Sequence, residues 1–137
     1  MSRNVLIIGG GRVGRRVAER LSEEQTMVTL VESDPEKCDQ VSPKVSHVIE
    51  GDGTDPDVLD QTDLASTDVL AALTNDTDVN LTACEMAHEA DPDIKTILRI
   101  SRDGEEDHGH RRFVDEIVYP AAAGANVAVD RITSARR

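Results

Sequence analysis

Short apolar runs alternate with amphipathic stretches along this chain of 137 residues. Near-continuous apolar runs are typical of strands in a parallel sheet, because helices cover both of its faces. The runs predict six strands, near residues 4–9, 27–32, 46–49, 68–73, 95–100 and 116–118. The amphipathic stretches predict six helices, near residues 12–24, 35–42, 56–61, 77–90, 106–113 and 121–134.

The alternation of strands and helices determines the expected fold class. It indicates strand–helix–strand units, which right-handed crossovers join into a parallel sheet. We therefore expect an α/β protein with a Rossmann-like, doubly wound parallel six-stranded sheet and helices on both faces. The length suits one core, so residues 1–137 are expected to form a single domain.

A glycine-rich turn directly follows the first predicted strand and opens the first predicted helix. Its sequence is Gly9-Gly10-Gly11-Arg12-Val13-Gly14. The first, third and last glycines have the spacing of a dinucleotide-binding turn, in which they form the tight turn, admit a pyrophosphate and let helix and strand pack closely. The free N–H groups at the helix start also favour phosphates. The turn therefore predicts a phosphate-binding site.

Glu32 ends the second predicted strand, about 20 residues beyond the turn, where such sites place an acidic residue that binds a ribose 2′-OH. The alternative is a polar residue at a strand end without a ligand. The charge of Glu32 would repel a 2′-phosphate, and Ser33 supplies no compensating cation. We therefore expect NAD(H) or adenine nucleotides to be preferred over NADP.

Polar residues also follow the third and fourth predicted strands. Asp52 is a candidate acceptor for the adenine amine, with Gly53 and Thr54 beside it, or else part of a polar turn that caps the next helix. Two further candidates, Thr74 and Asn75, face the phosphates or second ribose in this interpretation. Asp76 directly follows them as a third candidate, and it is also a suitable helix N-cap. All these residues lie at carboxyl ends of strands, where doubly wound sheets bind ligands.

Two arginines add candidate cations. Arg12 lies inside the glycine turn, and Arg99 lies in the otherwise apolar fifth predicted strand. A charged side chain in a central strand usually has a partner, either an anionic ligand or an acidic residue in a structural ion pair. We favour the ligand for Arg12 and the structural pair for Arg99, and retain both as candidate site residues.

The sequence contains no recognisable catalytic set, so binding without turnover is the simplest hypothesis. The alternative is an NAD-dependent oxidoreductase domain or fragment, which would need a substrate domain and a proton donor. His108 and His110 could chelate a metal, but no third ligand has suitable spacing, and a solvated loop is favoured. Cys38 and Cys84 form no CxxC motif and are expected to be packing residues.

The formal net charge is −12, from 27 acidic and 15 basic residues. An acidic, lysine-poor surface suits a salt-rich cytoplasm, because molar salt shortens the Debye length to about 3 Å. We therefore hypothesise a halophilic source. The same charge argues against nucleic acid or an anionic membrane surface as a partner. No apolar run is long enough to span a membrane, and we expect a cytoplasmic protein.

Taken together, these motifs resemble the TrkA N-terminal domain, also called the regulator of potassium conductance domain, of potassium uptake and channel systems. The resemblance covers nearly the whole chain. It rests on Ile7-Ile8-Gly9-Gly10-Gly11-Arg12-Val13-Gly14, Val31-Glu32-Ser33-Asp34, Gly51-Asp52-Gly53-Thr54-Asp55-Pro56, Asp68-Val69-Leu70-Ala71-Ala72-Leu73-Thr74-Asn75-Asp76, Asn80-Leu81 and Val114-Asp115-Glu116-Ile117-Val118-Tyr119-Pro120.

The resemblance implies a regulatory domain that binds NAD(H), ATP or ADP and controls a separate membrane potassium transporter or channel subunit. It also implies a homo-dimer or higher homo-oligomer at the inner face of the cell membrane. In this family, an arginine at the position of Arg12 can reach terminal phosphates. The chain departs from the family in carrying Glu32 where Asp is more frequent, and in its polar segment 102–112. Many members carry a second ligand-binding domain, whereas this chain ends at Arg137.

Overall fold

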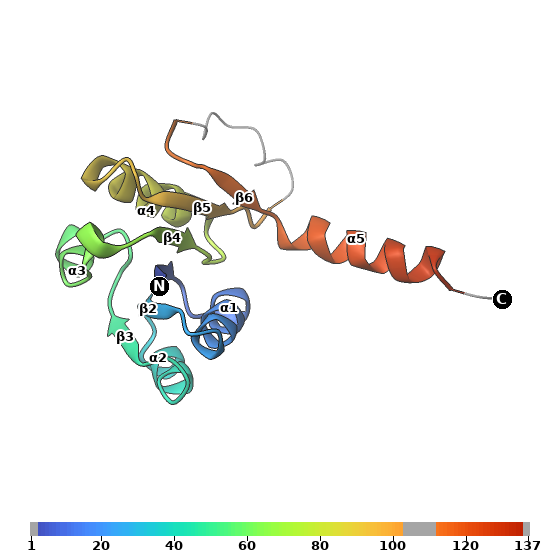
Figure 1. Ribbon diagram of the computed structural model, residues 1–137, viewed down its shortest axis with the longest axis horizontal. Helices are drawn as coiled ribbons and strands as arrows, with labels where there is room; N and C mark the ends of the chain where they lie inside the picture. The colour runs from blue at the N-terminus through green and yellow to red at the C-terminus, as the bar shows by residue number, and fades with distance from the viewer. Residues whose placement is uncertain (1–2, 103–111, 136–137) are drawn as a thin grey trace.

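The computed structural model describes residues 3–102 and 112–135 and contains one parallel sheet with flanking helices (Figure 1). The strands are β1 (Asn4–Ile8), β2 (Met27–Glu32), β3 (His47–Glu50), β4 (Val69–Ala72), β5 (Lys95–Arg99) and β6 (Glu116–Val118). The helices are α1 (Arg12–Glu23), α2 (Pro35–Val41), α3 (Pro56–Asp60), α4 (Thr77–Ala90) and α5 (Pro120–Thr133), with a 3-10 turn η1 (Leu64–Ser66). Of the helix predicted near 106–113, only residues 112 and 113 are described.

The strand order is β3-β2-β1-β4-β5-β6, and every neighbouring pair is parallel. The chain winds outward from β1 to β3, then crosses back to β4 on the other side of β1. This order confirms the doubly wound α/β fold. It places the topological switch point between β1 and β4, where ligands bind in open sheets of this kind.

Alternate residues of the strands divide the core into two apolar layers. From β1, Leu6 and Ile8 pack towards α3 and α4, where the small residues Ala83 and Ala87 let α4 approach the sheet. The neighbouring Ile7 packs on the opposite face, towards α1 and α2. Figure 1 shows the two helix pairs on opposite sides of the sheet. Buried apolar area on both faces thus holds β1 and β4 rigidly beneath the switch point.

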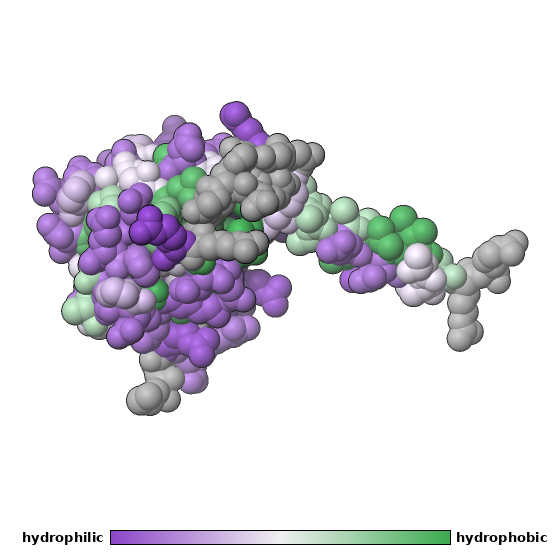
Figure 2. Space-filling model, turned by 90° about the horizontal axis from the view of Figure 1, so that it is seen from above, coloured by the Kyte–Doolittle hydropathy of each residue, from purple (hydrophilic) through white to green (hydrophobic). Residues whose placement is uncertain are grey.

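The last helix does not return to its own sheet. A single residue, Tyr119, separates β6 from α5, and Pro120 begins the helix. Residues 121–135 are all exposed, and α5 extends away from the body of the molecule (Figure 1). Figure 2 shows apolar side chains along this projecting helix. The prediction of a helix near 121–134 is confirmed, but this helix covers neither face of the sheet within one copy.

None of the helices in the described part of the chain is long and apolar enough to cross a membrane.

Candidate functional site

A hollow of about 710 Å³ lies over the carboxyl ends of the central strands. Twelve of the candidates named from the sequence line it: Gly9, Gly11, Arg12, Val13, Glu32, Ser33, Asp52, Gly53, Thr74, Asn75, Asp76 and Arg99. The other three, Gly10, Gly14 and Thr54, do not line the hollow but contact residues that do, as described below. The fold therefore gathers residues from five separate segments around one space.

The glycine turn has the three geometric properties expected of a phosphate-binding turn. Gly9 has a φ of +104°, and a Cβ there would lie 2.8 Å from Cγ2 of Thr74. A Cβ on Gly14 would lie 1.9 Å from the carbonyl oxygen of Gly9, so α1 packs directly against the turn. By contrast, a Cβ on Gly11 would meet nothing within 4 Å. Gly11 therefore leaves open space on the side of the hollow, where a pyrophosphate would approach.

The N-terminus of α1 differs from those of α2, α3 and α4. Helices α2, α3 and α4 are capped by Asp34, Asp55 and Asp76 respectively. The carboxylate of each aspartate accepts a backbone N–H from the first turn of its helix. Helix α1 begins after Gly11, which has no side chain to cap it, and has no acidic residue in its first turn. The first N–H groups and the positive end of the helix dipole are thus available to an anion in the hollow.

Glu32 is nine-tenths buried and holds two backbone segments together. Its Oε1 accepts the N–H of Gly10 at 2.7 Å, and its Oε2 accepts the N–H of Asp34 at 2.7 Å. Its relative exposure is 8%. An ionised carboxylate has about four lone-pair sites, so both oxygens keep acceptor capacity for the hydroxyls of a ribose. The bond to Gly10 fixes the glycine turn relative to the end of β2.

Asp52 and Thr54 form a compact turn after β3. The Oδ1 of Asp52 accepts the Thr54 N–H at 2.8 Å and the Thr54 hydroxyl at 2.7 Å. These bonds hold the pKa of the Asp52 carboxyl below its ordinary value, with the backbone bond the larger cause. The helix that follows is capped by Asp55, not Asp52. Asp52 thus belongs to the polar turn that precedes this cap, as the alternative interpretation predicted, and it also lines the hollow.

The loop after β4 is held by Asn80, which is fully buried. Its Oδ1 accepts the N–H and the hydroxyl of Thr74, at 3.0 and 2.6 Å. Its Nδ2 donates to the carbonyls of Thr74 and Arg99, both at 3.0 Å. One side chain thus ties together the carboxyl ends of β4 and β5. Asp76 caps α4, as one of the two interpretations of this segment predicted.

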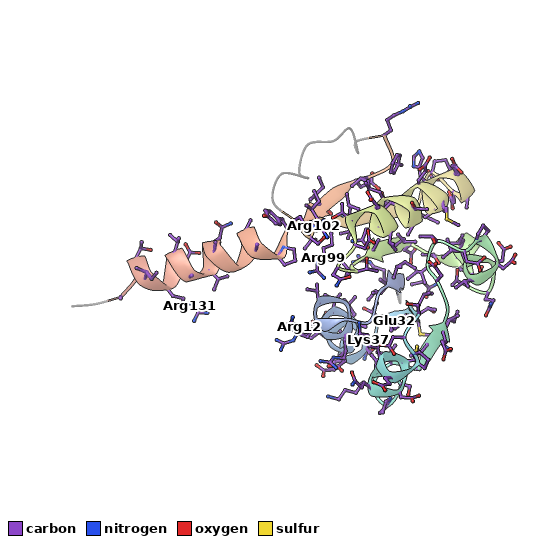
Figure 3. The ribbon with its side chains drawn as sticks, turned by 180° about the vertical axis from the view of Figure 1, so that it is seen from behind. Arg12, Glu32, Lys37, Arg99, Arg102 and Arg131 are labelled. Atoms are coloured by element: carbon purple, nitrogen blue, oxygen red, sulfur yellow. The ribbon has the colours of Figure 1, made fainter. Side chains whose placement is uncertain are left out.

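Three cations border the hollow: Arg12 from α1, Lys37 from α2 and Arg99 from β5 (Figure 3). The Nη1 of Arg99 donates to the carbonyl of Leu73 at 3.2 Å, while its Nε is buried with no hydrogen-bond partner. Burial, and secondly the charge of Arg12, lower the pKa of Arg99. The only ion pair among the described residues joins Lys95 and Glu116, so the structural pair that we favoured for Arg99 is absent there.

A known domain family covers the hollow and most of the fold. The TrkA-N domain profile matches residues 5–120. This chain belongs to the TrkA-N domain family. A Trk system potassium uptake protein TrkA homolog from Pyrococcus abyssi is 39% identical over 128 residues, which cover 89% of this chain and 56% of that protein. The chain therefore spans just over half the length of this relative.

Solved structures contain the same fold. The TrkA-N domain of inner membrane protein ybaL from Escherichia coli superposes with a TM-score of 0.84 at 18% identity, covering 95% of this chain and 96% of that one. A structure of GsuK bound to ADP gives a TM-score of 0.75 at 25% identity, covering 93% of this chain and 33% of that one. The similarity to the TrkA-N domain of ybaL extends over the full fold described above.

This TrkA-N domain shows no metal-ligating group of His, Cys, Asp or Glu in residues 3–102 and 112–135. His108 and His110 lie outside the described residues.

Both cysteines are buried. Burial raises the pKa of the Cys84 thiol to about 12, and Cys38 donates to the carbonyl of Glu32 at 3.3 Å. Both therefore act as packing residues, as predicted.

Sequence reasoning missed two contributors to this site. Lys37 was not identified as a cation at the hollow, although its place in the first turn of the helix after Glu32 points back to the strand end. Asn80 was placed only in the general region of Thr74. Its four hydrogen bonds could not be derived from spacing, because they depend on how α4 packs between β4 and β5.

Proposed function

We propose that this TrkA-N domain binds an adenine nucleotide, NAD(H) or ATP/ADP, and regulates a membrane potassium transporter or channel subunit. One observation carries the proposal: the uncapped N-terminus of α1 opens into the same hollow as the buried Glu32 carboxylate. The helix start suits a phosphate and the carboxylate suits a ribose. A similar structure, GsuK, was solved with ADP, which supports the adenine nucleotide class.

The regulatory role rests on the relatives named as Trk system potassium uptake proteins. A nucleotide can control a partner only through its different affinities for two arrangements of the assembly. In this proposal the domain lies in the cytoplasm, at the inner face of the cell membrane through its partner. Binding is not followed by chemistry, and the residues lining the hollow include no group placed as a proton donor beside a substrate pocket.

A thermal-shift panel of NAD, NADH, NADPH, ATP, ADP and AMP in molar KCl tests the binding proposal. A ligand at about 100 times its Kd stabilises by about 2.7 kcal/mol, which raises Tm by about 10 °C in a domain of this size. We expect NADPH to give a smaller shift in Tm than NADH, because the charge of Glu32 would repel its 2′-phosphate. Gly11→Val should remove the shifts by filling the space that the pyrophosphate needs.

Unchanged nucleotide affinity in Gly11→Val would show that the ligand does not approach this turn. An oxidoreductase remains the second candidate, motivated by the dinucleotide-type turn. Incubation with NADH and carbonyl substrates separates the two, since a sensor leaves the absorbance of NADH constant. Steady substrate-dependent oxidation of NADH would support the oxidoreductase.

We further propose that the domain forms homo-oligomers through α5. The spacing of Ala121, Ala125, Ala128 and Ile132 places them on one face of the helix, with Val129 beside them. Ile132 is 72% exposed and Val129 is 55% exposed. Small residues along a helix face let a second backbone approach closely. A second copy of the chain is present wherever the first one is. The one-residue connection at Tyr119 holds α5 away from its own sheet, so this face is open to that second copy.

Charge on this face should dissociate the oligomer. We expect Val129→Asp with Ile132→Asp to shift the chain towards monomer in sedimentation equilibrium, with at least tenfold weaker association, because two carboxylates would be desolvated in an apolar contact. Val127→Asp is the matched control, since Val127 is 54% exposed but lies on the other side of α5. Equal association of the two variants would exclude this face as the contact.

A further inference from the structure

The strands change from apolar to polar along the face of the sheet that α3 and α4 cover. At the carboxyl ends, Ile8 and Val31 belong to the apolar core of this face, and Ile49 packs against it. Towards the amino ends, alternation along β2 and β3 places Thr29 and His47 on the same face. His47 is exposed and Thr29 is only partly buried. The core therefore does not seal the amino half of this face.

The short helix α3 explains why this half stays open. It has five residues against 14 in α4, so it is only about 7.5 Å long. It lies near the carboxyl ends of the strands, because its Val58 packs on Gly51, where an added Cβ would be 2.7 Å from Cγ2 of Val58. At the other end of the strands, Met27 is left 48% exposed.

A hollow of about 300 Å³ lies over this open half, and we call it the amino-end hollow. Residues of β1, β2 and β3 line it together with the segment between α3 and β4, which contributes Thr62, Asp63, Ser66 and Thr67. It shares no lining residue with the hollow proposed for the nucleotide, although β1 and β2 contribute to both. The two hollows can therefore be occupied at the same time.

The lining of the amino-end hollow combines apolar surface with a carboxylate. Leu6 and Met27 supply apolar surface, and Asp63 supplies the carboxylate. The Oδ2 of Asp63 accepts the hydroxyl of Ser66. An ionised carboxylate has about four lone-pair sites, so Asp63 keeps acceptor capacity for a further donor. Within the part of the chain that the structure describes, Asp63 forms no ion pair.

The surface around the amino-end hollow is also acidic. Between Lys44 and Lys95 the sequence contains no lysine or arginine. Asp60 and Asp68, which flank the lining segment 62–67, are both exposed. The formal net charge of −12 acts in the same direction. The electrostatic potential at this hollow therefore favours a cationic occupant.

We propose that the amino-end hollow holds an arginine side chain from a cytosolic segment of the membrane potassium transporter or channel subunit. Arginine matches the lining, because its apolar stem packs on surface such as that of Leu6 and Met27 while its planar head forms paired bonds to a carboxylate. For its partner the inference rests on the proposed function, and cytosolic loops of membrane proteins are rich in arginine and lysine. A second copy of the chain, a nucleic acid and an anionic lipid surface are all acidic, so charge favours none of them in this hollow.

Fluorescence anisotropy with a labelled peptide tests the proposal on the 137-residue chain. The probe is a dansyl-labelled peptide of sequence Gly-Ser-Arg-Leu-Arg-Ser-Gly with an amidated end. Its matched control carries lysine in place of each arginine and has the same charge. In about 0.15 M KCl we expect saturable binding of the arginine peptide and about fivefold weaker binding of the lysine peptide, because an ammonium group cannot form the paired bonds.

Three variants separate insertion into the hollow from general attraction to an acidic protein. Asp63→Asn keeps an oxygen for the hydroxyl of Ser66 but removes the charge, and should weaken binding of the arginine peptide about tenfold. Glu85→Gln is the matched control, since Glu85 is exposed on α4 and lines neither hollow, and affinity should change less than about twofold. Thr29→Phe leaves the charge unchanged but fills the hollow, and should also weaken binding about tenfold.

Nucleotide thermal shifts show that each variant is folded, since none of the three changed residues lines the hollow proposed for the nucleotide. They also keep this test apart from that of the proposed function. A wild-type chain that shifts with nucleotide but binds neither peptide, or both equally, overturns this inference alone. Loss of peptide binding at the amino-end hollow in none of the variants has the same meaning.

Two further outcomes are distinct. Peptide binding that depends on Asp63 in a chain without any nucleotide shift would contradict the proposed nucleotide binding and leave this inference standing. Self-association in sedimentation velocity that Asp63→Asn abolishes would identify a second copy as the occupant, and the membrane subunit would then be the wrong partner.

Discussion

Gly14→Ala is expected to destabilise the domain by about 3 kcal/mol or more and to abolish nucleotide binding. A Cβ at this position would lie 1.9 Å from the carbonyl oxygen of Gly9 and 3.0 Å from its carbonyl carbon. Neither atom belongs to a side chain that can rotate away, so α1 must move off the turn, with a cost at the upper end of overpacking effects. Chemical denaturation monitored by circular dichroism measures the loss.

The direction of this effect is informative because helix propensity opposes it. Alanine inside a helix is favoured over glycine by about 1 kcal/mol, so stabilisation of the variant would refute the close contact. Gly11→Ala is the control, since the added Cβ meets no atom within 4 Å. We expect its stability to change by less than about 1 kcal/mol. Two glycines three residues apart should thus respond very differently to the same substitution.

Glu32→Ala is expected to reduce nucleotide affinity about 100-fold and to cost about 1–3 kcal/mol of stability. The carboxylate accepts the N–H groups of Gly10 and Asp34, and its removal leaves both without their charged acceptor. It also removes the acceptor proposed for the ribose hydroxyls. Isothermal titration calorimetry with the nucleotide that gives the largest thermal shift, together with a denaturation curve, separates the two effects.

Two further substitutions serve as controls for this result. Ser33→Ala removes a hydroxyl that lies 3.4 Å from Oε2 of Glu32 and should change affinity by less than about threefold. Glu32→Asp keeps the charge but withdraws it from Gly10, and should retain part of the affinity. If Glu32→Ala binds NAD and ATP as tightly as the wild type, the carboxylate has only a structural role.

The sequence predicted the parts of the site that depend on local geometry. The glycine turn and Glu32 could be placed at the edge of the hollow because the proposed contacts each require a particular residue type at a particular distance from a strand end. The switch point followed from the order of strands and helices. The interpretation of Arg99 was wrong because a strand pattern reveals burial but not which neighbour a long side chain contacts. That neighbour, the carbonyl of Leu73, directly follows β4 and lies 26 residues away in the sequence.

The course of α5 could not be predicted for a different reason. Its composition is that of an ordinary amphipathic helix, and the pattern near 121–134 indicated only that a helix forms. Whether such a helix folds back on its sheet depends on the length of the connection before it. The connection between β6 and α5 is the single residue Tyr119, whereas the connection between β1 and α1 has three residues, Gly9 to Gly11.

The bonds around Asn80 connect the hollow at the strand ends to the base of α5. Asn80 joins Thr74 to the carbonyl of Arg99, and the next residue, Ile100, donates to the carbonyl of Val118 at 2.9 Å. Val118 precedes the single residue before α5. The helix has 14 residues and is about 21 Å long. By geometry alone, a tilt of about 10° at its base would move its far end by about 4 Å, so any displacement of the strand ends would be enlarged along α5.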